Sequence, residues 1–241
     1  MIQLPNDAAE AAAQSLDAAQ SALTAGLTRI QVELKIPELK VQPIAKDFIA
    51  GFADYGDRLR VFFPDAGAAA LARRDWGETA FAIRGINDVK ADIQEQEELF
   101  IFVEPSAVEV REVEKLCEQA GDRPVIFLNP ALEDVATIGI GYAGRQLRDR
   151  FLSQIESCYY IRPLDAAALF RCYPDDWQLW LEKGDSYEKI ADFSERPSGE
   201  AIDNIFLSLN SGDASPGDGS PRPAKAGFLT NLQRFFNALS Q

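Results

Sequence analysis

The sequence predicts an α/β fold: a three-layer-like mixed sheet with a parallel βαβ core, to which antiparallel strands are added in the C-terminal half. Three short apolar runs each stop at a proline next to an acidic or amide residue, which is typical of buried parallel strands that end at one polar edge. Later apolar runs follow one another with only turns between them, which indicates antiparallel pairing. The early runs are residues 61–63, 100–103 and 125–128.

The first part of the chain is expected to alternate helices and strands. Residues 7–26 are alanine-rich, and Asp7 and Gly26 suit the N-cap and the stop of a helix. Residues 29–36 alternate apolar and polar side chains, which predicts a strand with one solvated face at the edge of the sheet. The other elements expected here are helices at 44–55 and 66–74 and strands at 59–63 and 81–86.

The clearest βαβ unit lies in the middle of the chain. A buried strand at 99–103 precedes a helix at 106–120, with Ser106 as its N-cap and Gly121 as its stop, and a second strand follows at 125–128. The two strands should be parallel neighbours joined by a right-handed crossover. Beyond them we expect a helix at 145–155 and antiparallel strands at 158–161, 170–173, 177–182 and 189–193.

Composition divides the chain into four parts. These are an N-terminal helix at 1–28, an α/β domain at 29–207, a flexible linker at 208–226 and an amphipathic helix at 227–241. A helix as short as the last segment is marginal alone in water, so it needs a membrane interface, a partner groove or its own domain to fold against. Its apolar face consists of Phe228, Leu232, Phe235, Phe236 and Leu239.

Bulk composition excludes several classes of function. The formal charge of −14 disfavours nucleic acid as a partner. Histidine is absent, which excludes Ser-His-Asp and Cys-His catalysis. No metal-ligand spacing is present. The sequence therefore predicts no catalytic set, no cofactor and no metal. No run is long enough to cross a bilayer and no signal peptide is recognisable, which predicts a cytoplasmic protein. Three cysteines without a CxxC pair are expected to be buried thiols.

Polar residues at the three strand ends form the first candidate ligand site. Asp65, Glu104 and Asn129 would line the carboxyl edge of a parallel sheet, which is where such folds bind ligands. The same residue types cap helices and form turns, so a purely structural role is the alternative.

A glycine-rich segment forms the second candidate site. Gly139, Gly141 and Gly144 match the G-x-G-x-x-G pattern of dinucleotide sites and lead into a helix. No clear strand runs into the pattern, which favours a glycine turn over a pyrophosphate site. In the following helix, Arg148 is the best candidate to hold an anion or an acidic partner segment, the alternative being a solvated helix face.

Arginines and aromatic residues are interleaved in the C-terminal half. Arg162, Arg171 and Trp177 are expected to bind a partner, because guanidinium groups stack on aromatic rings and pair with acidic groups. Ordinary packing of the aromatic side chains in the core is the alternative.

Five motifs are shared with a known family: RQLRDRF at 145–151, YYIRPL at 159–164, LFRCYP at 169–174, RPVIFLNP at 123–130 and VEL at 32–34. Together they resemble a domain of unknown function found in cyanobacteria and chloroplasts, numbered one-nine-nine-five, over residues 29–202. Its plant relatives include the low-photosystem-II-accumulation type of stromal assembly protein. The resemblance implies photosynthetic cells, the cytosolic or stromal side of thylakoids and photosystem assembly, and it carries over no catalytic residues.

Two classes of function follow. The first is a non-enzymatic accessory factor for the assembly of photosynthetic complexes of the photosystem II type. It would contact a photosystem or thylakoid membrane protein at the cytosolic face of the thylakoid, with peripheral membrane contact as an option. The second is a small-molecule or nucleotide-binding α/β enzyme that uses the carboxyl edge of its sheet.

Overall fold

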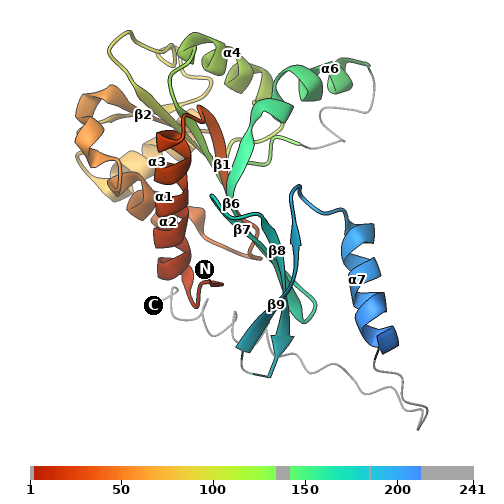
Figure 1. The fold of residues 1–241 in the computed structure, drawn as a ribbon. Helices are drawn as coiled ribbons and strands as arrows, with labels where there is room; N and C mark the ends of the chain where they lie inside the picture. The colour runs from red at the N-terminus through yellow and green to blue at the C-terminus, as the bar shows by residue number, and fades with distance from the viewer. Residues whose placement is uncertain (1–2, 134–141, 185, 213–241) are drawn as a thin grey trace.

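The fold is described from a computed structural model, in residues 3–133, 142–184 and 186–212. It is built around one nine-stranded sheet (Figure 1). The strands are β1 (Arg29–Leu34), β2 (Leu59–Phe63), β3 (Ala82–Gly85), β4 (Leu99–Val103), β5 (Val125–Leu128), β6 (Glu156–Leu164), β7 (Ala167–Cys172), β8 (Trp177–Lys183) and β9 (Ser186–Phe193).

The sheet is mixed, which confirms the predicted fold class. Its strand order is β3-β2-β4-β5-β1-β6-β7-β8-β9. Neighbours from β3 to β6 are parallel, whereas those from β6 to β9 are antiparallel. Strand β6 belongs to both parts, so the strands β6 to β9 form an antiparallel extension of a parallel sheet.

Helices cover both faces of this sheet (Figure 1). On one face, α1 (Ala8–Thr24), α2 (Val41–Ala50) and α3 (Ala66–Trp76) contribute to the largest apolar cluster. On the other face, α4 (Val110–Ala120) and α6 (Tyr142–Arg150) cover the parallel strands, and α7 (Gly199–Gly212) covers the antiparallel extension. Two short 3-10 helices are η1 (Ala53–Arg58) and η2 (Leu152–Gln154).

The three proline-terminated strands are the core of the molecule. Every residue of β2, β4 and β5 is buried, because helices lie on both faces of this part of the sheet. On the α4 side, Phe62, Phe102 and Phe127 form a row across the three strands, with ring centroids 4.7 and 5.4 Å apart. Strands β4 and β5 are parallel neighbours joined through α4, as the sequence predicts.

Strand β1 lies in the middle of the sheet, and the prediction that it forms an edge was wrong. Its polar residues Gln31 and Glu33 do face away from the largest apolar cluster, as the alternating pattern requires. Gln31 is half-buried and Glu33 is only 4% exposed, because side chains from distant parts of the chain cover it. A strand with alternating apolar and polar residues can therefore lie at the centre of a sheet when its polar side chains pair with other polar side chains instead of facing solvent.

Several element boundaries differ from those predicted, among them the start of α4 and the end of α7. Helix α4 begins at Val110, because Ser106 forms a turn with Glu109, whose Oε2 accepts hydrogen bonds from the Ser106 backbone (3.1 Å) and hydroxyl (2.6 Å). Helix α7 continues to Gly212, past the expected start of the linker at 208. The rest of that linker and the expected helix at 227–241 lie outside the described residues.

Candidate functional site

The polar residues at the three strand ends support the backbone. Asp65 caps α3, and its Oδ1 accepts a hydrogen bond from the Ala68 backbone at 2.9 Å. Asn129 has a φ of 52°, and its Oδ1 accepts from the Leu34 backbone at 3.2 Å, so it ties the end of β5 to β1. Glu104 has a φ of 51°, and desolvation raises the pKa of its carboxyl group above the ordinary range. All three residues follow strands that end at the same edge of the sheet, but Asp65 and Asn129 already accept backbone hydrogen bonds there.

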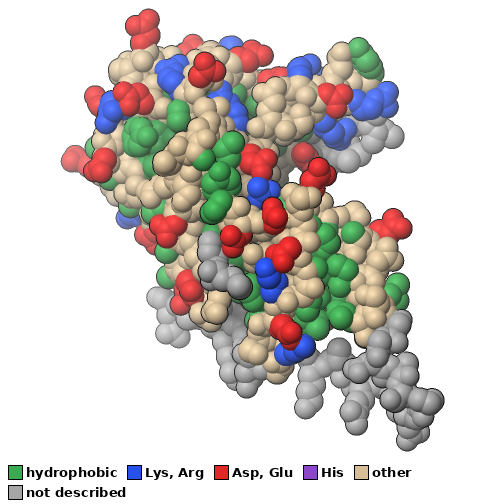
Figure 2. All heavy atoms as spheres, viewed as in Figure 1, with side chains coloured by type: hydrophobic (Ala, Val, Ile, Leu, Met, Phe, Trp, Pro, Cys, Tyr) green, Lys and Arg blue, Asp and Glu red, His purple; other side chains and the backbone are tan. Residues whose placement is uncertain are grey.

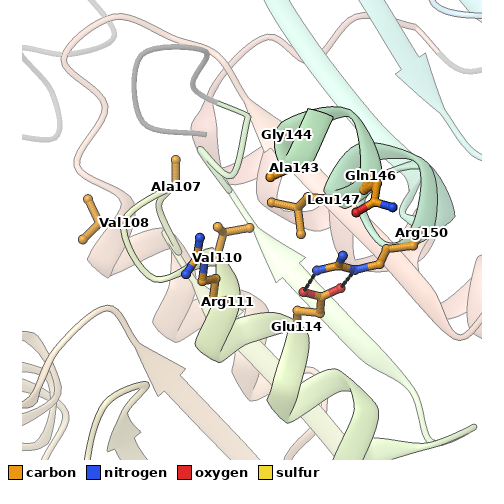
Figure 3. A pocket seen from close by; sticks show the side chains of 10 residues that line it. All are labelled: Ala107, Val108, Val110, Arg111, Glu114, Ala143, Gly144, Gln146, Leu147 and Arg150. Atoms are coloured by element: carbon orange, nitrogen blue, oxygen red, sulfur yellow. Dashed lines mark hydrogen bonds and ion pairs between the residues drawn. The ribbon is translucent and has the colours of Figure 1, made fainter. Parts of the chain in front are cut away.

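A hollow of about 600 Å³ lies between α4 and α6 (Figure 3). Gly144 is buried in α6 beside it, while Gly139 and Gly141 lie outside the described residues. The main cation at this hollow is neutralised: Arg150 donates two hydrogen bonds, of 2.6 and 2.8 Å, to Glu114. This pairing lowers the pKa of Glu114. Arg148 lies on the same helix and is partly buried.

The interleaved arginines and aromatics form a stacked group, which we call the arginine–aromatic cluster: Tyr160, Arg171, Trp177 and Arg196. The Tyr160 and Trp177 rings lie 5.0 Å apart and are almost fully buried. The guanidinium carbon of Arg196 lies 4.5 Å from the Tyr160 ring centre and 5.6 Å from that of Trp177. The guanidinium carbon of Arg171 lies 5.5 Å from the Trp177 ring centre.

The two arginines of this cluster differ in exposure. Arg171 is held by a 2.6 Å hydrogen bond to Glu156, and its side chain is 14% exposed. Its Nε is buried with no hydrogen-bond partner in the part of the chain that the structure describes. The Arg196 side chain is 48% exposed, although it donates a 2.9 Å hydrogen bond to the Tyr160 hydroxyl. The two rings are therefore part of the core, and the Arg196 guanidinium remains open to solvent.

A buried carboxylate lies next to the cluster. Glu33 pairs with Tyr160 across β1 and β6, so their side chains share one face of the sheet. The Glu33 carboxylate accepts hydrogen bonds from Gln31 (3.1 Å) and Ser157 (3.4 Å) and forms an ion pair with Lys35 at 3.3 Å. Arg196 is a looser partner at 3.9 Å. This polar group separates the apolar cluster under α4 and α6 from the one under α7.

A groove of about 410 Å³ runs beside the cluster, between the antiparallel extension and α7, and we call it the α7 groove. Its lining combines apolar side chains with two arginines and two aspartates. Arg162, one of the predicted partner-binding residues, is exposed and belongs to this lining. Apolar lining residues include Leu164, Leu169, Ile202 and Phe206, and the charged ones are Arg162, Arg196, Asp165 and Asp203.

The three cysteines are poor nucleophiles. Cys117, Cys158 and Cys172 are buried free thiols, as expected from the sequence, and burial raises the pKa of each to about 12. A thiol with such a pKa carries almost no thiolate near neutral pH. Across residues 3–133, 142–184 and 186–212, no three His, Cys, Asp or Glu side chains are grouped to hold a metal ion, and no helix is long and apolar enough to span a membrane.

Sequence reasoning singled out Arg171 and Trp177, which do belong to the cluster, but it treated Glu33 as an exposed strand residue. Glu33 meets Ser157 and Arg196, which lie more than 120 residues further along the chain. The signal that could have pointed to Glu33 is its position: it is the charged residue in the middle of the motif VEL at 32–34, within a predicted strand.

Fold and site together define a class: a parallel α/β domain with an antiparallel extension, whose most distinctive surface is an open guanidinium on a buried aromatic platform beside a helix-covered groove. Residues 5–204 match the family model described as "Domain of unknown function (DUF1995)". The chain belongs to this family, which confirms the resemblance seen in the motifs. The match also includes α1, which the sequence had set apart from the domain.

Proposed function

We propose that the protein is a non-enzymatic accessory factor that binds another protein through the arginine–aromatic cluster, and that it serves the assembly of photosynthetic complexes of the photosystem II type. One observation carries the binding part: the Arg196 guanidinium lies against the buried Tyr160 and Trp177 rings while about half of its side chain stays exposed. Arginine, tyrosine and tryptophan are the residues that most often dominate binding energy in protein interfaces.

Preorganisation strengthens this interpretation. An arginine on a flexible surface loses side-chain entropy on binding, of about 0.5–1.5 kcal/mol for each immobilised side chain. Stacking and the Tyr160 hydrogen bond already restrict Arg196. Its ion-pair partner Glu33 lies at the outer limit of contact, 3.9 Å away, so an incoming carboxylate can pair with Arg196 without breaking a tight internal contact.

The biological setting comes from the family resemblance of the motifs, which points to the cytosolic face of thylakoids and to a photosystem or thylakoid membrane protein as partner. Affinity purification of the tagged full chain from detergent-solubilised thylakoids tests this. We expect photosystem II subunits to be enriched at least tenfold over photosystem I subunits. Equal recovery of the two photosystems, or of neither, contradicts the proposed setting.

Peripheral membrane contact through residues 227–241 is a separate part of the proposal. These residues contain several phenylalanines and leucines but only one basic residue, Arg234, so binding would rest on apolar insertion rather than on lipid charge. Deleting 227–241 should move the protein from the membrane fraction to the soluble fraction. An unchanged distribution counts against membrane contact.

A second candidate function is small-molecule or nucleotide binding. The hollow between α4 and α6 favours it, because it is of ligand size and has Arg111 and Gly144 in its lining. A thermal-shift screen with nucleotides and sugar phosphates tests it, since a ligand that binds only the native state raises the melting temperature. We expect no shift if the hollow is structural; a shift that Arg111→Ala abolishes would establish this second function instead.

A further inference from the structure

Helix α7 covers the antiparallel extension incompletely. Ile202, Ile205 and Phe206 face the apolar cluster under the helix, but the α7 groove stays open along one side. Two further apolar side chains of the helix, Leu207 and Leu209, are 64% and 44% exposed. Figure 2 shows a patch of hydrophobic side chains between β9 and α7, at the place that Figure 1 identifies. Apolar surface of this kind is usually covered in the functioning molecule.

The chain itself continues from the end of this helix. Residues 213–226 are rich in Gly, Ser and Pro, and a chain of that composition and length spans roughly 20 Å between its ends. Residues 227–241 follow, with Phe228, Leu232, Phe235 and Leu239 at helical spacing. A helical segment with an apolar face, and a groove with Leu164, Leu169, Ile202 and Phe206 in its lining, are thus joined by a tether long enough to bring them together.

We infer that residues 227–241 bind the α7 groove of the same chain, as a helix antiparallel to α7. A tether of this length corresponds to an effective concentration in the millimolar range, so even a weak affinity between segment and groove is enough for occupancy. A free partner at micromolar concentration must bind about a thousandfold more tightly to compete on equal terms. The chain's own segment is therefore the favoured occupant.

Charge positions support the antiparallel direction. Asp203 lies nine residues before the end of α7, which is about 13 Å along the helix. In a helix that starts at 227, Arg234 lies about 10 Å from its beginning. When the two helices run in opposite directions and residue 227 lies level with the end of α7, Arg234 comes within about 3 Å of the level of Asp203 in the groove lining. Arg234 is the only basic residue of the segment.

The consequence is a competition at the binding surface. The groove lining includes Tyr160, Arg162 and Arg196, so the bound segment lies against the arginine–aromatic cluster. A partner that uses the cluster would have to displace the segment, and its apparent affinity is reduced by the fraction of chains in which the groove is open. The inference concerns the free protein and does not depend on which partner binds; contact of residues 227–241 with a membrane would compete with the groove for the same apolar face.

A photo-crosslinking amino acid tests this in the full chain. We place p-benzoylphenylalanine at Phe206, inside the groove, and as a matched control at Leu71, which is 42% exposed on α3 on the opposite face of the sheet. After irradiation of the dilute protein, mass spectrometry should find the Phe206 label attached to residues 227–241 of the same chain at least tenfold more often than the Leu71 label. Attachment between two chains, or equal attachment from both positions, overturns the inference.

Charge exchange supplies an independent check. Asp203→Arg should lower the yield of this crosslink severalfold, and adding Arg234→Asp should restore it. If both variants give the wild-type yield, the antiparallel register is wrong. If the crosslink fails while photosystem II subunits are still captured, this inference is wrong and the proposed function stands. If the crosslink forms but no photosystem II subunit is captured, the proposed function is wrong and the groove contact stands.

Discussion

Arg60 and Glu97 form an ion pair whose side chains are only 8% and 3% exposed. Arg60 also donates hydrogen bonds to the carbonyls of Lys90 and Asp92 (3.1 and 3.2 Å), so it fastens the long segment between β3 and β4 to the sheet. Burying two charges costs free energy that pairing only just offsets, but a single buried charge left without its partner is strongly destabilising.

Removing one member of this pair should therefore cost more than removing both. Arg60→Met is expected to lower the free energy of unfolding by about 3–5 kcal/mol. The double variant Arg60→Met/Glu97→Leu should recover much of that loss, because no buried charge remains. Urea denaturation measures both, and a single variant that costs less than the double one would contradict the interpretation.

Single residues also show the limit of sequence reasoning about the site. Tyr160 and Trp177 could be assigned to the core because they lie in apolar strands. Arg171 could be assigned to their neighbourhood because it lies between them in the sequence. The open position of Arg196 and the burial of Glu33 could not, because both depend on a contact between β1 and the segment after β9. The alternation of apolar and polar residues in a strand predicts on which face of the sheet a side chain lies, but not which other residues cover that face.

Among the elements, α4 and α6 are linked by the ion pair between Glu114 and Arg150. The pairing lowers the pKa of Glu114, so it stabilises the fold above the ordinary glutamate pKa of about 4.3 and is lost as pH falls through the lowered value. Glu114→Gln should thus lower the melting temperature at pH 7 but make little difference at pH 2.5. A difference that stays constant with pH would contradict this, and Glu112→Gln, at an exposed position of the same helix, is the control.

Helix α7 should be the least firmly held helix of the described chain, because it packs on one side only and leaves a groove beside it. Ile202, which is 9% exposed and the only buried residue among 199–209, anchors it. Ile202→Ala should speed amide hydrogen exchange in 199–212 at least tenfold, with little change in the strands below. Asn204→Ala, at an exposed polar position of the same helix, is the control, and equal exchange in the two variants would show that Ile202 is not the anchor.

At the level of elements, the sequence was most informative where local signals agree. The strands β2 and β4 were predicted residue for residue, and the caps of α1 and α3 were predicted at Asp7 and Asp65. Helix α4 was placed too early, because a serine suited to capping forms a turn with Glu109 instead. Such competition between two local hydrogen-bond patterns cannot be resolved from residue types alone.

For the whole molecule, the parallel core and the late antiparallel strands follow from the spacing of the elements, but the order of the strands does not. The later strands β5 and β6 pair with β1 on either side, and this puts the residues of β1 beside both halves of the sheet. That arrangement creates the polar group around Glu33 and, next to it, the open face of Arg196. The candidate site is thus a product of topology and not of any one motif.

The most direct test of the account is whether Arg196 carries partner binding. Affinity purification from thylakoids is compared for the wild-type chain, Arg196→Ala, Arg196→Lys and the control Arg74→Ala, which removes an exposed arginine on α3. We predict that photosystem II capture falls at least tenfold with Arg196→Ala, falls partly with Arg196→Lys, which keeps the charge but not the guanidinium group, and is unchanged with Arg74→Ala. Equal capture by all four proteins, with each shown to be folded by its melting temperature, would contradict the claim that this surface is the binding site.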